Sequence, residues 1–405
     1  MTPLFRKFLG TNWLLLLNML ALLGWGIYAI YTASYFREKV ALAVKWRSQT
    51  EWAAMGFVVM VAVSLIDYKW VRRLAIPMYI VGIGGLIATF KFATEINGAK
   101  NRIDLGSLQL QPSQFAIAAG ILLLAVVLGD LHRVAPIFRH HWLRLFAAGI
   151  LAVIPMAMVL KQSDLGSAAV WGPVLVSMLL VGNMPFRYLI VIFLCVACML
   201  PVAYFFGLKP YQKNRIEVFI RMLTNQKVNI LGNAYQANNI QIAVGSAGFE
   251  GKGPQSIKVS EQRSIHRTFY PETEAINDFL YSTNVEEFGF RGGVLVIACT
   301  ALMLLQCVFI AFYSRDQLGR LIVVGIVAML FTHAFQNMGM NILMTPITGI
   351  PLPFMSYGGT FLVVCMFLMG MVQSIWIHRN ISPVKKKKKG NGRDREEEEE
   401  VAEEA

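Results

Sequence analysis

The sequence predicts an all-α polytopic membrane protein with about ten transmembrane helices. Of its 405 residues, 56% are hydrophobic and 15% are charged, and the mean hydropathy is +0.53. Soluble domains contain about 45–50% apolar and about 25% charged residues, so this composition excludes an ordinary soluble protein. Runs long enough to cross a hydrocarbon core of about 30 Å recur near residues 13–33, 51–66, 76–92, 113–130, 143–160, 166–182, 187–206, 288–313, 319–340 and 358–378.

The distribution of basic residues predicts the orientation in the cell inner (cytoplasmic) membrane. An even number of spans places both termini on one side, and the run SPVKKKKKG near the C-terminus places that side in the cytoplasm. We therefore expect a cytoplasmic N-terminus over residues 1–12, a membrane domain over 13–380 and a disordered charged cytoplasmic tail over 381–405. The first connection departs from the rule, because it carries positive charge to the outer side at Arg37, Lys39, Lys45 and Arg47.

The net charge of +13 would suggest a nucleic-acid partner in a soluble protein. Here the basic residues lie in the connections and in the tail, where anionic lipid headgroups are close. We therefore expect the membrane surface, and no nucleic acid, as the partner of these charges.

One connection, about residues 207–277, is much longer than the others and is predicted to be extracytoplasmic. Loops of this length are usually functional or disordered. Its segment YQANNIQIAVGSAGFEGKG ends in closely spaced glycines around Lys252. Glycines allow a backbone to approach a phosphate-bearing ligand and to expose N–H groups as an anion nest, and Lys252 would add a positive charge. An ordinary flexible loop is the alternative.

Acidic residues lead directly into the eighth span, in YPETEAINDFLYSTNVEEFGFRGG. A carboxylate at the membrane edge is costly to bury, and it is usually solvated at the boundary or functional. Asp278 is the candidate, with capping of the following helix as the alternative role. Glu286 and Glu287 would lie on other faces of that helix, so the three carboxylates do not predict one catalytic cluster.

Five segments resemble the SEDS family of cell-wall polymerases, in the order and spacing that the family shows. The match runs from the first span to Arg379, and FQNMGMN and TGIPLPF favour the elongation-type branch, RodA, over FtsW. The five segments are QPSQFA (Gln111–Ala116), SDLGSA (Ser163–Ala168), IAVGSAGFEGKG, NDFLYSTNVEEFGF and FQNMGMNILMTPITGIPLPFMSYGG (Phe335–Gly359).

The resemblance implies a peptidoglycan glycosyltransferase that polymerises lipid II on the outer face of the cytoplasmic membrane, for cell elongation and shape. Asp278 matches the essential Asp of the family and would act as the base. Lys252 and Arg215 would meet the leaving pyrophosphate, with Lys161 and Arg102 as weaker candidates. A divalent cation, Mg or Mn, could share that work, although its ligands are unknown. The resemblance also implies a single-span class B penicillin-binding protein as partner.

The segment GIPLPFMSYGG stands between two apolar runs and carries two prolines and two adjacent glycines. Such non-helical backbone at membrane depth is tolerated where it lines a protein cavity, so we expect it to form a wall of the substrate cavity. Ser356 and Tyr357 supply hydroxyl groups there. These groups would either orient the substrate or satisfy the freed backbone, and the sequence leaves both open.

The chain departs from the family pattern at several positions. Gln114 and Ile117 replace the usual Glu and Lys, and Ser163 replaces a proline.

Two other functions remain open. A lipid II flippase or other transporter would be expected to show inverted repeats and ionisable groups near mid-membrane, and a structural scaffold of the wall-synthesis complex would need neither Asp278 nor Lys252.

Overall fold

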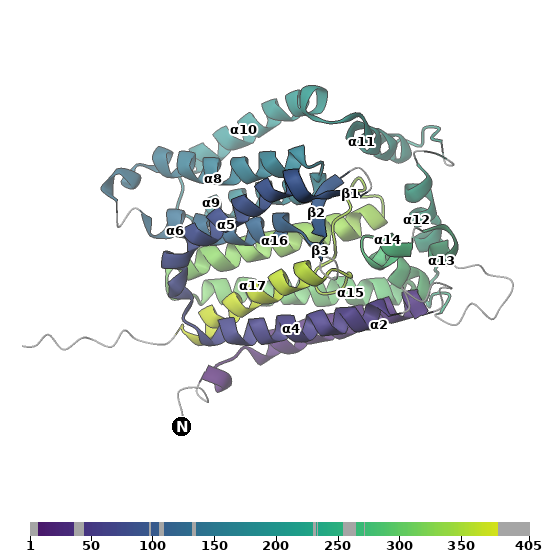
Figure 1. The fold of residues 1–405 in the computed structure, drawn as a ribbon, viewed down its shortest axis with the longest axis horizontal. Coiled ribbons are helices and arrows are strands. Elements are labelled where there is room, and N and C mark those ends of the chain that lie inside the picture. Colours follow the sequence, from purple (N-terminus) through teal and green to yellow (C-terminus); the bar gives the residue numbers. More distant parts are fainter. Residues whose placement is uncertain are drawn as a thin grey trace, which may run out of the picture.

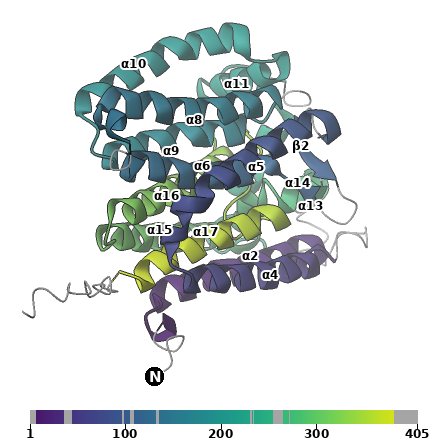
Figure 2. The ribbon, with the colours of Figure 1, turned by 60° about the vertical axis from the view of Figure 1, so that its left-hand side comes forward.

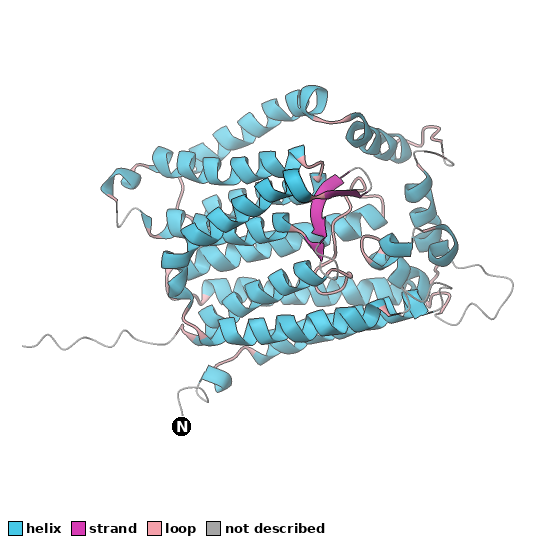
Figure 3. Cartoon of the chain, in the orientation of Figure 1, coloured by secondary structure: helices cyan, strands magenta, loops and turns pink. Residues whose placement is uncertain are grey.

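The computed structural model describes residues 7–35, 44–96, 99–104, 109–131, 135–229, 232, 234–253, 265–270 and 272–379. Arg37, Lys39 and the charged tail lie outside these residues. Figure 3 shows that the described part is almost entirely helical, with one small sheet.

Ten long helices of the described part correspond to the ten predicted spans (Figure 1). Eight are long and apolar enough to cross a membrane, and α9 and α10 have 17 residues each. The all-helical, roughly ten-span prediction is thus confirmed. The bounds are α2 Trp13–Tyr35, α4 Lys45–Leu65, α5 Val71–Phe92, α6 Pro112–Gly129, α8 His141–Lys161, α9 Leu165–Val181, α10 Phe186–Val202, α15 Leu280–Phe312, α16 Gln317–Asn341 and α17 Gly359–Ile377.

The helices α6 and α16 form the centre of the bundle. α16 packs against α6, α9, α15 and α17, and α6 packs against α5 and α8 (Figure 2). α6 is apolar on every side, which is typical of a helix surrounded by other helices. α17 packs on α4, and α2 packs on α15. The pairs α4–α17 and α2–α15 bring the two ends of the chain's membrane domain together.

The described residues of the long connection form four short helices at one end of the bundle: α11 Pro210–Leu223, α12 Tyr235–Gly245, α13 Ile265–Phe269 and α14 Glu272–Ile276 (Figure 1). A π-helical turn, Ala203–Gly207, precedes them. A three-stranded antiparallel sheet lies at the same end, with strands β1 Thr94–Ile96, β2 Ala99–Asp104 and β3 Gln109–Leu110. Two short 3-10 helices, Tyr68–Trp70 and Pro136–Arg139, lie in the connections at the opposite end.

The two positions that lack the family's charged pair are both fully buried in α6. Gln114 Nε2 donates to Ser167 Oγ at 3.2 Å, and Gln114 Oε1 lies 3.2 Å from His333 Nε2. His333 is thus a hydrogen-bonded core residue. Ile117, one turn further along, packs in the main apolar core. The two positions therefore hold a hydrogen-bonded amide and an apolar core side chain.

We expect Ile117→Lys to lower the yield of folded protein, because a lone lysine at mid-span costs roughly 2.5–3.5 kcal/mol on insertion scales. Adding Gln114→Glu should restore much of the yield, since positions three apart share a helix face. The measurement is the size-exclusion peak area in detergent for the wild type, both single variants and the double variant. A double variant no better than Ile117→Lys would show that the two sites do not pair.

Candidate active site

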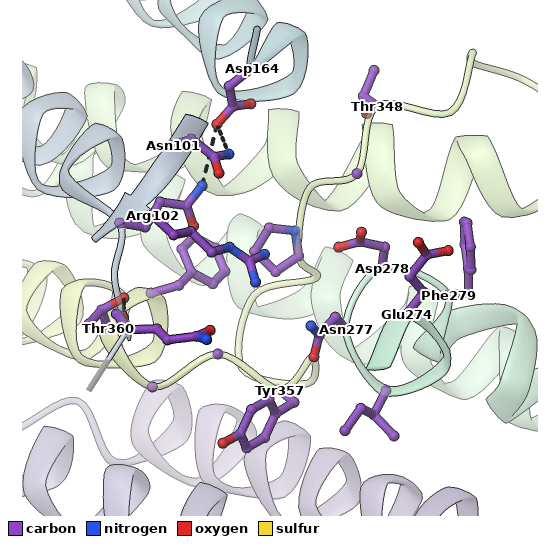
Figure 4. A pocket seen from close by; sticks show the side chains of 18 of the residues that line it. Asn101, Arg102, Asp164, Glu274, Asn277, Asp278, Phe279, Thr348, Tyr357 and Thr360 are labelled. Carbon is purple, nitrogen blue, oxygen red and sulfur yellow. Dashed lines mark hydrogen bonds between the residues drawn. The ribbon is translucent and has the colours of Figure 1, made fainter. Parts of the chain in front are cut away.

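A cavity of about 380 Å³ lies at the end of the bundle that carries the sheet. Its walls come from the β2–β3 hairpin, the starts of α9 and α15, helix α11 and the GIPLPFMSYGG segment (Figure 4). The prediction that this segment forms a cavity wall is thus confirmed. Charged side chains of both signs reach the lining: Lys45, Arg102, Arg215, Asp164, Glu274 and Asp278.

Asp278 lies in the short link between α14 and α15. Its backbone oxygen accepts hydrogen bonds from Asn337 Nδ2 at 2.9 Å and from Asn341 Nδ2 at 3.3 Å. Its carboxylate points into the cavity, on the same side as Glu274 (Figure 4). Helix α15 begins at Leu280, and the residue at its cap position is Phe279, without a side-chain cap. The alternative role of Asp278 as a helix cap is therefore wrong.

The surroundings of Asp278 make its carboxylate a stronger base than an exposed aspartate. Burial raises the pKa of Asp278, and the nearby Asp164 carboxylate raises it further, while Arg102 and Arg215 oppose the shift. The net effect is a pKa above the usual value, because desolvation dominates. Gly349 preserves the space in front of this group, since a Cβ there would lie 3.3 Å from Asp278 Oδ2.

Asp164 is a second cavity carboxylate, and it holds the hairpin in place. It caps α9 through a bond from Ser167 N to Asp164 Oδ1 at 2.9 Å. Asp164 Oδ2 accepts from Ser167 Oγ at 2.8 Å, from Asn101 Nδ2 at 2.8 Å and from Gln111 Nε2 at 3.4 Å. Two dashed lines in Figure 4 end on this carboxylate. With its oxygens occupied in this way, Asp164 serves to position the hairpin.

Among the described residues, three cations line the cavity. Arg102 extends from β2 toward Asp278 (Figure 4), and Arg215 of α11 donates from one terminal nitrogen to Ile347 O at 3.2 Å. Lys45 Nζ lies 5.1 Å from the centre of the Tyr357 ring. The presence of Lys45 gives a reason for the positive charge in the first connection, because at least this residue faces a cavity at that end.

Ser356 and Tyr357 have different roles. Ser356 is buried; its Oγ donates to Asn277 O at 2.5 Å and accepts from Leu352 N at 2.9 Å. It therefore satisfies the non-helical backbone and does not line the cavity. Tyr357 does line it, and the backbone N–H of Tyr357 donates to Ile276 O at 2.9 Å. Of the two predicted residues, Tyr357 is the one that lines the cavity.

Lys252 is not part of the cavity lining, contrary to the pyrophosphate role expected for it. Its Nζ lies 2.8 Å from Glu286 Oε1, in an ion pair that is almost fully buried. Glu286 Oε2 is also 2.7 Å from His266 Nδ1. Lys161 is exposed at the end of α8 and likewise does not line the cavity. Of the four cations predicted to meet the pyrophosphate, Arg102 and Arg215 line the cavity.

The glycine-rich segment packs against a break in α15 instead of forming an anion nest. The N–H groups of Lys252 and Gly253 donate to the carbonyls of Glu286 and Glu287, each at 2.9 Å. Gly251 and Gly289 both have positive φ, and a Cβ on either would collide with the backbone of the other segment. These glycines are required because two backbones meet here, and the N–H groups named are already used.

His266 links the long connection to α15 through two carboxylates. Its Nδ1 lies 2.7 Å from Glu286 Oε2, and its Nε2 lies 3.3 Å from Glu287 Oε1. Glu287 Oε2 also accepts from Thr32 Oγ1 at 2.6 Å, and Lys252 faces Glu286. Burial opposes protonation of His266, but its contacts with the two glutamates outweigh burial and raise its pKa.

We therefore expect stability to depend on the protonation of His266. Because the folded-state pKa of His266 is raised, its contribution is complete below about pH 6.5, the unfolded value, and is lost as pH rises through the folded-state pKa. The melting temperature in detergent should fall across this interval, and His266→Gln should flatten the fall. An equal slope in the variant would show that another group is responsible.

The described residues contain no group of three or more His, Cys, Asp or Glu side chains placed to hold a metal ion. In the cavity, both carboxylate oxygens of Asp164 accept hydrogen bonds, and Glu274 Oε2 accepts from Gln236 Nε2 at 2.9 Å. The cavity carboxylates of the described residues therefore form no cluster of that kind for a divalent cation.

The match to known families decides the affiliation of the chain. The family model FTSW_RODA_SPOVE, described as a cell cycle protein, matches residues 12–381. The chain belongs to the FtsW/RodA/SpoVE family. This is the SEDS family of the resemblance, and members of the family include the Treponema pallidum protein named peptidoglycan glycosyltransferase RodA. That protein is 31% identical over 90% of this chain and 97% of its own length.

A further relative and a solved structure support the family and the fold. The Escherichia coli K12 protein named peptidoglycan glycosyltransferase MrdB is 30% identical over 91% of this chain and 94% of its own length. A solved chain, described as "Structural coordination of polymerization and crosslinking by a peptidoglycan synthase complex", superposes with a TM-score of 0.71. It is 22% identical and covers 92% of this chain and 99% of its own, so it shows a shared fold. The chain is a multi-pass membrane protein of that family.

Sequence reasoning did not select several residues that form the site. Asn337 and Asn341 lie within a family-like segment, and two amides one turn apart in an apolar span are a signal of a buried polar contact. Asp164 showed a similar signal, as a carboxylate next to an apolar run. Glu274 belongs to the acidic run that leads into the eighth span, but nothing local distinguishes it from the other acidic residues of that run.

Proposed function

We propose that this protein is a peptidoglycan glycosyltransferase that polymerises lipid II into glycan strands, for cell elongation and shape. The observation that carries the proposal is the basic carboxylate of Asp278, which faces a cavity lined by cations, in a chain of the SEDS family. The names of the related RodA and MrdB proteins support the same activity.

In the proposed reaction, Asp278 is the general base. The 4-hydroxyl oxygen of the acceptor sugar attacks the anomeric carbon of the donor, and Asp278 takes the hydroxyl proton as the new C–O bond forms. The bond between that carbon and the pyrophosphate oxygen breaks, and undecaprenyl pyrophosphate leaves with the bonding electrons. A single in-line displacement inverts the α-linked donor to a β-1,4 product, so no second nucleophile is required.

The cations of the lining would stabilise the charge that develops on the leaving pyrophosphate. Arg102 and Arg215 are on β2 and α11, and Lys45 is on α4, so three separate elements present positive charge to one cavity. Such fixed charges accelerate a reaction because they need no reorganisation when the leaving group becomes more negative. The Tyr357 hydroxyl would orient a sugar or phosphate group.

We propose a location in the cytoplasmic membrane with both termini in the cytoplasm. The start of α2 and the end of α17 lie at the end of the bundle opposite the cavity (Figure 1), so this orientation places the cavity at the outer face.

As partner we propose a single-span class B penicillin-binding protein. The structurally similar chain belongs to a peptidoglycan synthase complex that coordinates polymerization and crosslinking, which supports a transpeptidase of this kind.

The test is to reconstitute the purified protein with its transpeptidase partner and supply lipid II. We expect glycan polymer on a denaturing gel when the partner's transpeptidase is blocked by a β-lactam. Transfer of lipid II across the bilayer without polymer would favour the flippase, and neither polymer nor transfer would favour the scaffold. Either result would overturn the proposal.

A further inference from the structure

The turn between α8 and α9 holds a serine in an unusual backbone conformation. The backbone N–H of Ser163 donates to Leu160 O at 3.0 Å, and that of Asp164 donates to Val159 O at 3.3 Å. Ser163 has a φ of 70°. Together these features make the Schellman end of a helix, where glycine is the usual residue because a Cβ is unfavourable at positive φ. A serine kept in this conformation at the edge of a cavity suggests a function for its side chain.

Ser163 is one of the positions where the chain departs from the family pattern, which has a proline there. A proline could not form this turn, because it lacks the N–H that bonds to Leu160 and its φ is fixed near −65°. The serine therefore changes the shape of the turn and adds a hydroxyl group. Ser163 is 6% exposed and lines the cavity of Asp278.

The hydroxyl of Ser163 is bound by a lysine from the long connection. Lys209 Nζ donates to Ser163 Oγ at 2.7 Å. Lys209 is the cap residue of α11, and its backbone N–H donates to Gln212 Oε1 at 2.9 Å, so this lysine is fixed to the first turn of α11. The bond thus joins the start of α11 to the turn that precedes α9.

The place of α11 beside the cavity depends on side-chain contacts of this kind. In the described part of the chain, no other helix or strand packs extensively against α11, which follows α10 at the edge of the bundle (Figure 1). Six residues after Lys209, Arg215 lines the cavity and donates to Ile347 O at 3.2 Å. Because a short helix moves as a rigid rod, a displacement of its start would also displace Arg215.

We propose that Lys209 is a positioning residue, whose bond to Ser163 holds α11 at the cavity and presents Arg215 to the anionic leaving group. The inference rests on the proposed function for the identity of that group. Lys209 is not part of the cavity lining, so it acts through Arg215. A cation stabilises developing charge most effectively when its position is fixed before the reaction.

Ser163→Gly separates the hydrogen bond from the turn, because glycine favours the positive φ and removes the hydroxyl. We expect about the same melting temperature in detergent but an about tenfold lower kcat/KM for lipid II, the smaller end of what a hydrogen bond to a charged group contributes. Most of the loss should be in kcat, since the charge on the pyrophosphate grows in the transition state. Ser163→Asn should restore the activity, because asparagine tolerates positive φ and its side-chain oxygen can accept from Lys209.

Lys209→Met should lower kcat/KM by the same factor as Ser163→Gly, and the double variant should be no slower than either one. The matched control is Lys213→Met, which removes a lysine of the same helix that donates to the nearby Phe205 O, and it should keep the wild-type kinetics. In an Arg215→Met background, Lys209→Met should have no further effect. A second tenfold loss in that background, or wild-type kinetics in Ser163→Gly, would overturn the proposal.

A distance measurement tests this inference without turnover. Spin labels on p-acetylphenylalanine at the exposed positions of Phe92 on α5 and Glu217 on α11 report the place of α11 by double electron–electron resonance. We expect a narrow distance distribution in the wild type and a broader one in Lys209→Met and in Ser163→Gly. Distributions that stay narrow would show that Lys209 does not hold α11. Absence of polymer from the wild type would contradict the proposed function, and the distance distributions would still decide whether Lys209 holds α11.

Discussion

Asp278→Asn is expected to lower the rate of lipid II polymerisation by roughly a hundredfold to ten-thousandfold. The substitution keeps the size and shape of the side chain and removes its basicity, and general base catalysis typically contributes that factor. Because the bonds from Asn337 and Asn341 go to the backbone oxygen of residue 278, the link between α14 and α15 should keep its structure. The measurement is the initial rate of polymer formation with the partner present.

The matched control is Glu217→Gln, which alters an exposed carboxylate on α11 outside the cavity lining. It should polymerise at the wild-type rate, and both variants should copurify with the partner in wild-type amounts. If Asp278→Asn kept more than about a tenth of the activity, Asp278 would not be the base.

The second large effect concerns stability. Glu286→Ala should lower the free energy of unfolding by about 3–5 kcal/mol, the usual cost of removing one partner from a buried ion pair. Glu286 accepts from Lys252 Nζ, from the backbone N–H groups of Ile265 and His266, and lies against the His266 ring. All of these groups would lose their acceptor inside the protein. The measurement is the free energy of unfolding of the wild type and of Glu286→Ala, from equilibrium unfolding in mixed micelles.

Two further variants separate charge from packing. Glu217→Ala removes an exposed helical pair with Arg221 and should change stability by less than about 0.5 kcal/mol. Glu286→Gln combined with Lys252→Met should be more stable than Glu286→Gln alone, because it leaves no unpaired lysine. If the double variant were the less stable of the two, Lys252 would contribute through something other than this ion pair.

The membrane-spanning helices were predictable because apolar length is a local property of the chain. The same holds for the non-helical wall, which the prolines and glycines of GIPLPFMSYGG indicate, and for Asp278, which stands at a membrane edge. The role of Asp278 as the base remains a prediction.

The distribution of the basic residues was not predictable in the same way. Arg215 and Lys252 are both cations of the long connection, and nothing local distinguishes them. Folding brings Glu286 and His266, from other segments, around Lys252, whereas Arg215 reaches the cavity. Which cation meets the substrate therefore depends on contacts between residues far apart in the sequence.

The hydrogen bonds of Asn337 have a consequence for how the cavity can change. Its Nδ2 donates to the backbone oxygens of both Asp278 and Ile350, so α16 carries the base and the non-helical wall as one unit. Asp164 joins the hairpin to the start of α9 as a second unit. The two groups also meet, because Gly166 at the start of α9 packs directly on Ile350 and Thr348 of the wall. We therefore expect loss of the Asn337 amide to displace the base and the wall together, which couples the position of Asp278 to a residue of α16 that does not line the cavity.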